Sequence, residues 1–398
     1  GRAVSLTEAL AHAERHSPLV GPAQARLGLG VAAIQGAEPL LRDNPEVEVG
    51  VGLRTRPGNE SSRGSNVRVQ QRLEVAGQRG ARLDAADRVT ALEEQRLAST
   101  RLALRTAVRA AFYQALLARS RTASARDAEA IQTRIVDIAR ARLRAGDIGP
   151  LGVRLAEGDL AQVAQARIEA EARETSARLR LAAMAGLPAD PLPELAGDLP
   201  EPAAPLPIDA LLEHARIAQP ARRVALAEIA ERESRLIVAS RESWPTPTVG
   251  FEYSREDSSQ NIWLATIGLP LPFFQRNQAE RAQTRAESAI ARAELEAIDS
   301  ALPARVRALA STADAAARRV ALYRRDVLPR SRENLQLLGR AFELGEIDAL
   351  EVSGARSRLL DVQRAALDAY DDYFRAMADL GAETGVEWPA RTQTRTQP

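Results

Sequence analysis

Cysteine is absent from this sequence of 398 residues, so disulfides, thiolate catalysis and thiolate metal sites are excluded. Histidine is scarce as well, and the only imidazoles are those of His12, His16 and His214. The four-residue spacing of His12 and His16 is compatible with a metal-binding pair on one helix face. Because no third ligand is evident, an ordinary polar face is the simpler interpretation, and we expect neither a metal site nor a cofactor.

Long hydrophobic runs and aromatic residues are also lacking. No stretch of about 18 apolar residues exists, which excludes a transmembrane helix. Aromatic residues make up only 4% of the chain, too few for a conventional thick core. No charged-plus-apolar signal segment opens the chain, which predicts a cytosolic protein or one whose signal was removed or omitted.

The charge balance and the absence of catalytic motifs argue against a nucleic-acid-binding protein and against an enzyme. The 54 basic residues, all of them arginine, are dispersed and balanced by 53 acidic ones, so no nucleic-acid partner is expected. No G-x-S-x-G, P-loop or HExxH motif is present, and we do not expect an enzyme.

An internal repeat organises the chain. The segment Leu187–Pro207 holds seven of the 22 prolines and cannot form a helix. On either side the same features follow in the same order: short helical stretches, two alternating segments, and a long helical run with one glycine turn. We therefore expect a first repeat over 1–186, a linker over 187–207, a second repeat over 208–385 and a tail over 386–398. Within the repeats we expect β-hairpins at about 46–75 and 247–271, and helical hairpins at about 79–186 and 277–382.

The long runs carry helical periodicity. Apolar residues recur at spacings of three and four, as in Val320, Tyr323 and Val327. The run from Arg79 to Ala145 has about 67 residues and would reach about 100 Å. A helix of this length must lie against neighbours along its length. The two turn sequences align Gly146 with Gly345, which supports a duplicated helical hairpin.

Two segments in each repeat alternate apolar and polar residues. The apolar positions are Val47, Val49, Val51, Leu53, Val67, Val69, Leu73 and Val75 in the first repeat, and Val249, Phe251, Tyr253, Trp263, Ala265, Ile267, Leu269 and Leu271 in the second. A period of two puts the apolar side chains on one strand face and the charges on the other. The pattern fits surface hairpins packed on the helices. It fits equally well membrane strands of about nine residues, with Tyr253 and Trp263 as interface aromatics.

The number of strands constrains the second interpretation. Four strands cannot close a membrane barrel, because about eight is the smallest known case. Open strand edges in lipid would leave backbone groups unpaired at several kcal/mol each. If these strands span a membrane, several chains must share the barrel.

With this order of elements, the chain resembles the TolC-like outer-membrane efflux protein family over nearly its whole length. The strings QRLEVAGQRGAR (Gln71–Arg82) and GLPLPFFQRNQAE (Gly268–Glu280) resemble its cobalt-zinc-cadmium resistance branch, the CzcC/CusC-like proteins. The resemblance implies a mainly α fold with a small β part. In the expected homotrimer, a long α-helical barrel and a shared 12-stranded transmembrane β-barrel follow one another, and the proline-rich linker lies in an equatorial belt.

The resemblance also implies location and partners. The β-barrel would lie in outer-membrane lipid, with a long extension into the periplasm. Such proteins are passive ducts that dock to a periplasmic adaptor (membrane fusion) protein, while an inner-membrane pump of the resistance-nodulation-division (RND) class supplies the energy.

The family's adaptor contacts lie at the tips of its helical hairpins. The matching residues are Arg142, Leu143 and Gly146 in the first repeat and Leu344 and Gly345 in the second, with Arg340 one residue off the first-repeat arginine position. The glycines are also explained as turn formers alone. Leu143 and Leu344 would be exposed apolar contacts for a partner hairpin.

The family also carries acids that form a ring at the periplasmic mouth. Glu351 stands at the first such position, but Gly354 occupies the second and Gly152 is the first-repeat equivalent of Glu351. Three Glu351 carboxylates near one axis would repel one another and attract cations. A solvated glutamate on a helix face is the alternative.

Cargo is the least constrained property. Export of heavy-metal cations follows from the branch resemblance, whereas two methionines and three histidines offer no evident binding site. Drug export and type I protein secretion are alternative uses of such a duct. A soluble periplasmic coiled-coil scaffold is an alternative of a different class, which explains the helices but not hairpins with an apolar face.

Overall fold

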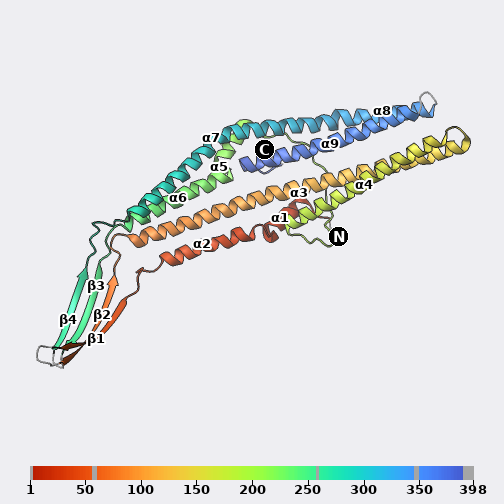
Figure 1. The fold of residues 1–398 in the computed structure, drawn as a ribbon. Helices are drawn as coiled ribbons and strands as arrows, with labels where there is room; N and C mark the ends of the chain where they lie inside the picture. Colours follow the sequence, from red (N-terminus) through yellow and green to blue (C-terminus); the bar gives the residue numbers. More distant parts are fainter. Residues whose placement is uncertain (1–2, 56–60, 257–259, 345–348, 389–398) are drawn as a thin grey trace, which may run out of the picture. The chain divides into compact units, whose positions relative to one another are not determined.

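A computed structural model describes residues 3–55, 61–256, 260–344 and 349–388. Helices dominate, and one small sheet interrupts them (Figure 1). The order is α1 (Leu6–His16), α2 (Gly21–Ala37), β1 (Glu46–Thr55), β2 (Ser61–Arg72), α3 (Gln78–Ala145), α4 (Pro150–Ala185), α5 (Ile208–Ala218), α6 (Pro220–Arg241), β3 (Thr248–Glu256), β4 (Gln260–Gly268), α7 (Gln278–Leu322), a π-helical turn (Tyr323–Val327), α8 (Leu328–Glu343) and α9 (Ala349–Thr384). The expectation of a mainly α fold with a small β part is confirmed.

The chain divides into two compact units. Unit 1 comprises Gly1–Pro22, Ala98–Pro220 and Asp299–Pro398, and unit 2 comprises Ala23–Leu97 and Ala221–Ile298. The sheet lies within unit 2, and the turn between α3 and α4 and the helices α8 and α9 lie within unit 1. Each unit draws on both halves of the sequence, so the repeats are interleaved rather than folded separately.

The helix ends follow from local sequence. Ser5 caps α1 in a capping box, in which its hydroxyl accepts from the Glu8 amide and the Glu8 carboxylate accepts from the Ser5 amide at 2.9 Å. Pro150 opens α4 directly after Gly149, where a missing N–H costs nothing. Gly186 ends the same helix with φ 69°, a left-handed conformation that glycine adopts without strain.

The proline-rich linker is held by side chains of the unit 1 helices. Arg119 on α3 donates to the carbonyl oxygens of Leu195, at 2.7 Å, and Gly197. Tyr370 on α9 donates to the Pro200 carbonyl at 3.2 Å. A segment without helical hydrogen bonds thus has several of its carbonyl groups satisfied by donors from neighbouring helices.

The four strands form one antiparallel sheet in the order β1-β2-β3-β4 (Figure 1). The two hairpins come from the two repeats and meet where β2 pairs with β3, with Val67 opposite Tyr253 and Val69 opposite Phe251. Strands β2 and β4 end before the alternating segments of the sequence do. They end at Arg72 and Gly268, so Leu73, Val75, Leu269 and Leu271 lie beyond the ladder.

An aromatic cluster forms part of the interior of unit 1. Tyr113 on α3 stacks on Phe374 of α9, with ring centroids 4.5 Å apart. Trp388, which follows α9, packs edge-on against Tyr373 at 5.1 Å. Tyr373 is fully buried, and its hydroxyl accepts from the Ala203 amide at 2.8 Å. Burial raises the pKa of Tyr373 to about 12.

The second long helical run is less regular than the first. Helix α3 is continuous over 68 residues. Its second-repeat counterpart contains Pro303 within α7 and passes through the π-helical turn Tyr323–Val327 before α8 begins. The π-helical turn shifts the hydrogen-bond pattern by one residue, so the spacing of three and four read through Tyr323 and Val327 does not describe a regular α-helix there.

Within the described ranges, no helix combines the length and the hydropathy of a membrane span.

Candidate functional site

One face of the sheet carries apolar side chains that no other part of the described chain covers. Val49, Val67, Tyr253 and Trp263 occupy one row across the four strands, and Val47, Val69, Phe251 and Ala265 occupy another. Val51 and Ile267, on the same face, are each 82% exposed. This arrangement does not match hairpins packed on helices, because their apolar face would then be buried.

Tyr253 and Trp263 lie directly opposite each other, as cross-strand partners in β3 and β4. Their ring centroids are 4.5 Å apart, and Phe251 lies 5.5 Å from the same indole. The Tyr253 hydroxyl donates to the Asn261 side-chain oxygen at 3.0 Å. An apolar ring body with a hydrogen-bonded polar tip is the chemistry of aromatic residues at a membrane interface.

A second group of exposed aromatics follows β4, and sequence reasoning did not single it out. Phe273 and Phe274 are 69% and 90% exposed, and Leu269 and Leu271 before them are also exposed. Their signal in the sequence is the apolar string GLPLPFF. The apolar surface therefore continues past the end of the strand.

The opposite face of the sheet is polar on β1, β2 and β3, whereas β4 adds the apolar residues Ile262 and Leu264 to it. Arg68 on β2 pairs with Glu48 on β1 at 3.2 Å and with Glu252 on β3 at 2.8 Å. In the adjacent polar row, Gln70 donates to Glu46 at 2.7 Å. The first three strands therefore separate an apolar face from a hydrogen-bonded polar face, as the alternation predicted. Strand β4 departs from the prediction, because Ile262 and Leu264 lie on the polar face.

The first hairpin tip is a tight glycine turn. Gly146 has φ 83°, and the amides of Gly146 and Asp147 donate to the Leu143 and Arg142 carbonyls at 3.1 and 2.9 Å. This is the left-handed helix ending that glycine permits. Arg142 is exposed and Leu143 is half-buried. The exposed aliphatic residues near this turn are Ile138, Leu151 and Leu155, which sequence reasoning missed because an amphipathic helix shows the same spacing.

The second tip is described only up to Leu344. That leucine is 74% exposed, and its amide donates to the Arg340 carbonyl at 3.0 Å. Gly345 lies outside the described residues. Glu351 belongs to α9, but its side chain is not among those described. The adaptor contact and the acidic ring therefore stay predictions.

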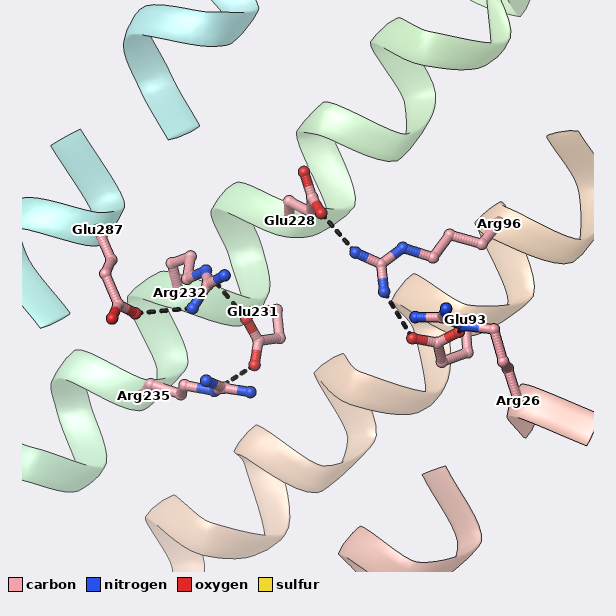
Figure 2. A network of polar contacts seen from close by, with 8 residues as sticks. All are labelled: Arg26, Glu93, Arg96, Glu228, Glu231, Arg232, Arg235 and Glu287. Carbon is pink, nitrogen blue, oxygen red and sulfur yellow. Dashed lines mark hydrogen bonds and ion pairs between the residues drawn. The ribbon is translucent and has the colours of Figure 1, made fainter. Parts of the chain in front are cut away.

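Unit 2 contains a network of carboxylates and arginines in which Glu93 and Glu231 are buried, and sequence reasoning also missed it (Figure 2). Glu93 on α3 is only 3% exposed and accepts from Arg26 of α2 at 3.0 Å and from Arg96 at 2.7 Å. Arg96 also reaches Glu228 of α6 at 2.5 Å. Burial acts to raise the pKa of Glu93, but the hydrogen bonds from both arginines outweigh it and lower the pKa below its ordinary value.

The same network continues from α6 to α7. Buried Glu231 pairs with Arg235, one turn along α6, and lies 3.7 Å from Arg232. Arg232 bridges to Glu287 of α7 at 2.6 Å (Figure 2). A hydrogen bond from Gln283 and the nearby arginines lower the pKa of Glu287. Four helices are thus linked by charged hydrogen bonds, with each buried acid paired.

His12 and His16 contact each other and the end of α4. The His12 ring nitrogen Nδ1 lies 2.9 Å from the Ala185 carbonyl at the end of α4, and the rings of His12 and His16 stack at 4.3 Å. Among the described residues, no group of three or more His, Cys, Asp or Glu side chains is arranged to hold a metal ion.

Comparison with known proteins gives consistent matches. A family model described as "Outer membrane efflux protein" matches residues 14–187 and 211–386. The cobalt-zinc-cadmium resistance protein CzcC of Cupriavidus metallidurans is 26% identical over 339 residues, which cover 85% of this chain and 80% of that protein.

Solved structures show a similar fold. The outer-membrane channel OprN superposes with a TM-score of 0.78 at 19% identity, covering 96% of this chain and 90% of that one. CusC gives a TM-score of 0.77 at 14% identity, with 95% and 91% covered. The CmeC outer membrane channel of Campylobacter jejuni gives 0.78 at 12% identity, with 96% and 85% covered.

Proposed function

Because this chain belongs to the outer membrane efflux protein family, we propose that it is the passive exit duct of a tripartite efflux system. The family consists of outer-membrane channel proteins rather than enzymes. The observation that carries the proposal is the sheet of unit 2, which has an uncovered apolar face, a polar opposite face and two outer strands, β1 and β4, each with one neighbour within the described chain.

Strand edges require a partner if the sheet lies in lipid. The outer edges of β1 and β4 carry backbone groups that water cannot satisfy in a bilayer, at several kcal/mol each. Pairing β4 of one copy with β1 of the next satisfies both edges, and the contact closes into a ring when the rotation allows it. We propose a homotrimer, in which three four-stranded sheets make a 12-stranded barrel.

Cysteine cross-linking tests this pairing in a chain that has no native cysteine. Glu48→Cys on β1 is combined in turn with Ile262→Cys, Leu264→Cys and Thr266→Cys on β4. At least one pair should give covalent trimers on a non-reducing gel after purification in detergent. Glu48→Cys alone is the control and should stay monomeric. A monodisperse protein that is soluble without detergent and never cross-links would instead support a periplasmic scaffold.

The hairpin tips are proposed to dock a periplasmic adaptor. Exposed Arg142 and Leu344 and half-buried Leu143 lie beside the turns of the two helical hairpins, where apolar contacts are available to a partner hairpin. Leu344→Asp should abolish co-purification of the adaptor without changing channel conductance. Leu179→Asp, an exposed leucine on α4 away from the tip, is the matched control. Equal adaptor recovery in both variants would reject the tip contact.

Heavy-metal cations are the proposed cargo, supplied by an RND-class pump through the adaptor. The support is the similarity to CzcC, whose name refers to cobalt, zinc and cadmium resistance. The test is a host strain lacking its own channel, given this chain with its neighbouring pump and adaptor genes. Recovered tolerance to these metals supports the proposal. Recovered drug tolerance or protein secretion, without metal tolerance, would replace it.

Glu351 is proposed as an acidic ring at the periplasmic mouth. Glu351→Gln should lower cation preference in single-channel recordings, because three like charges near one axis attract cations. Unchanged reversal potentials would reject the ring.

A further inference from the structure

The polar face of the sheet carries an ordered row of charges. Glu48, Arg68 and Glu252 are register partners on β1, β2 and β3. The Arg68 guanidinium lies between the two acids and contacts both, at 3.2 Å to Glu48 and 2.8 Å to Glu252. We call these three residues the charged row. Leu264 of β4 occupies the fourth position of the row.

Neighbouring groups keep the charged row in place. The Arg68 Nε and one terminal nitrogen both donate to Glu252, at 3.0 and 2.8 Å. Asn66, from the next row, donates to the same carboxylate at 3.3 Å. The Glu252 side chain is accordingly only 18% exposed, compared with 60% for Glu48. Glu252 is therefore fixed by several donors, and Glu48 is the accessible end of the row.

Uncharged residues lie next to the charged row on the side of the strand-to-strand loops. The adjacent row on the same face contains Gly50, Asn66, Ser254 and, on β4, Ile262. A side-chain carbon at Gly50 would collide with the Asn66 side-chain oxygen, which shows that Asn66 leans over this glycine. No charged side chain belongs to this adjacent row, so the charged row is not neutralised from that side.

The charged row is not neutral. Two carboxylates and one guanidinium give it a net charge of −1. The apolar face of the sheet must face lipid if the sheet spans a membrane, so the charged row faces the water-filled interior. A ring of fixed charges in such an interior raises the local concentration of counter-ions.

We propose that Glu48, Arg68 and Glu252 form a selectivity belt within the barrel, which favours hydrated cations over anions. This inference rests on the proposed duct and adds a second selective element at the outer membrane, separate from Glu351. Arg68 offsets part of the negative charge, so the belt attracts cations without holding them at a closed binding site. Its effect is strongest at low salt, because fixed charges are screened over about 10 Å at 0.1 M.

Removing the positive charge of the belt and removing one of its negative charges should shift the reversal potential in opposite directions. The full-length protein is reconstituted in planar bilayers, and the reversal potential is measured in a KCl gradient at low ionic strength. Arg68→Gln removes the only positive charge of the row and should move the reversal potential further toward the cation side. Glu48→Gln should move it toward the anion side, and the double variant Glu48→Gln/Glu252→Gln should move it further.

Charge-preserving variants are the matched controls. Arg68→Lys and Glu48→Asp keep each charge and should leave the reversal potential unchanged. Because Glu48 is the exposed end of the row, Glu48→Gln leaves the contacts of Glu252 in place and keeps the test valid if the double variant fails to fold. Salt dependence is a second measurement, since raising KCl should reduce the differences among the variants.

The outcomes separate the belt from the duct. Channels of normal conductance whose reversal potentials are the same in Arg68→Gln, Glu48→Gln and the unaltered protein would overturn the belt and leave the duct intact. A protein that inserts but forms no conducting channel would overturn the proposed duct, and the belt with it.

Discussion

Unit 1 buries a cluster of aromatic rings, whereas the helical segments that belong to unit 2 contain no aromatic residue and are joined by arginine–carboxylate pairs. Tyr113, Tyr373, Phe374 and Trp388 pack together in unit 1. In unit 2, all six aromatic residues lie in the sheet or beside it, at 244, 251, 253, 263, 273 and 274. The buried residues of the helices there are mostly small ones, namely alanine, glycine, serine and threonine, together with Leu92, Leu97, Gln78 and the network around Glu93 and Glu231.

Long helices that carry few large side chains can be held together in two ways, and each unit uses one of them. Aromatic rings contribute roughly 150–250 Å² of buried area each and tolerate no close backbone approach. Small residues allow close approach but bury little apolar area. Gly30 illustrates this, because a side-chain carbon there would lie 2.5 Å from the Thr90 hydroxyl. Charged hydrogen bonds then connect the helices of unit 2 at defined positions.

Tyr373→Ala is the strongest expected disruption of unit 1. Losing a fully buried aromatic side chain should cost about 3–5 kcal/mol, and Ala203 would lose both hydrogen bonds to the hydroxyl. Chemical unfolding in detergent measures the loss, and hydrogen exchange should locate it in unit 1. Tyr373→Phe keeps the ring and should cost less. If unit 2 exchanged as much as unit 1, the two units would share one cooperative core.

Glu93→Ala should destabilise unit 2 by about 2 kcal/mol, since hydrogen bonds to a charged group are lost and the remaining arginines are partly solvated. The rate of amide hydrogen exchange should rise in α2, α3 and α6 near Glu93. The exposed neighbour Glu94→Ala is the control and should change stability little. An equal loss of stability in the two variants would mean that the buried contacts of Glu93 do not stabilise unit 2.

Gly30→Ala should reduce stability by about 1 kcal/mol, because overpacking against Thr90 exceeds the gain in helix propensity. Gly28→Ala on the same helix meets no atom within 4 Å and should be neutral or stabilising. Differential unfolding of these two variants measures how close α2 and α3 approach. A stabilising Gly30→Ala would show that the contact is loose.

Acid should destabilise unit 2 first, and alkali should destabilise unit 1 first. The pKa values of Glu93 and Glu287 in unit 2 are lowered from 4.5 in the folded protein, so their stabilisation is present above pH 4.5 and is lost as pH falls through the lowered values. Glu171 in unit 1 also has a lowered pKa, but Glu93 is the buried one of these carboxylates and is least screened by solvent. The pKa of Tyr373 is raised from 10.0 to about 12, so its contribution is present below pH 10 and lost as pH rises toward 12. Exchange that increases first in unit 2 with acid and first in unit 1 with alkali would support this, and identical profiles would contradict it.

Much of the architecture could be predicted from local patterns. The glycine turn at Gly146, the long helix ending at Ala145 and the alternating strands each depend on residues only a few positions apart. The candidate site was predicted less completely. Tyr253 and Trp263 were named, but Phe273, Phe274 and the charged row were not, because exposure and cross-strand pairing are not local properties. The π-helical turn at Tyr323–Val327 was missed for a related reason, since the spacing of apolar residues there also fits an α-helix.

The sequence by itself determined the duplicated order of elements and the two unlike faces of β1 and β3, because periods of two and of 3.6 residues specify which side chains share a face. Only the tertiary structure decided that β2 pairs with β3 across the two repeats, and that Arg68 therefore lies between Glu48 and Glu252. It also decided that Glu93 and Glu231 are buried while other glutamates on the same helices are not. These choices depend on contacts between residues more than a hundred positions apart, such as Arg96 and Glu228. No local spacing carries that information.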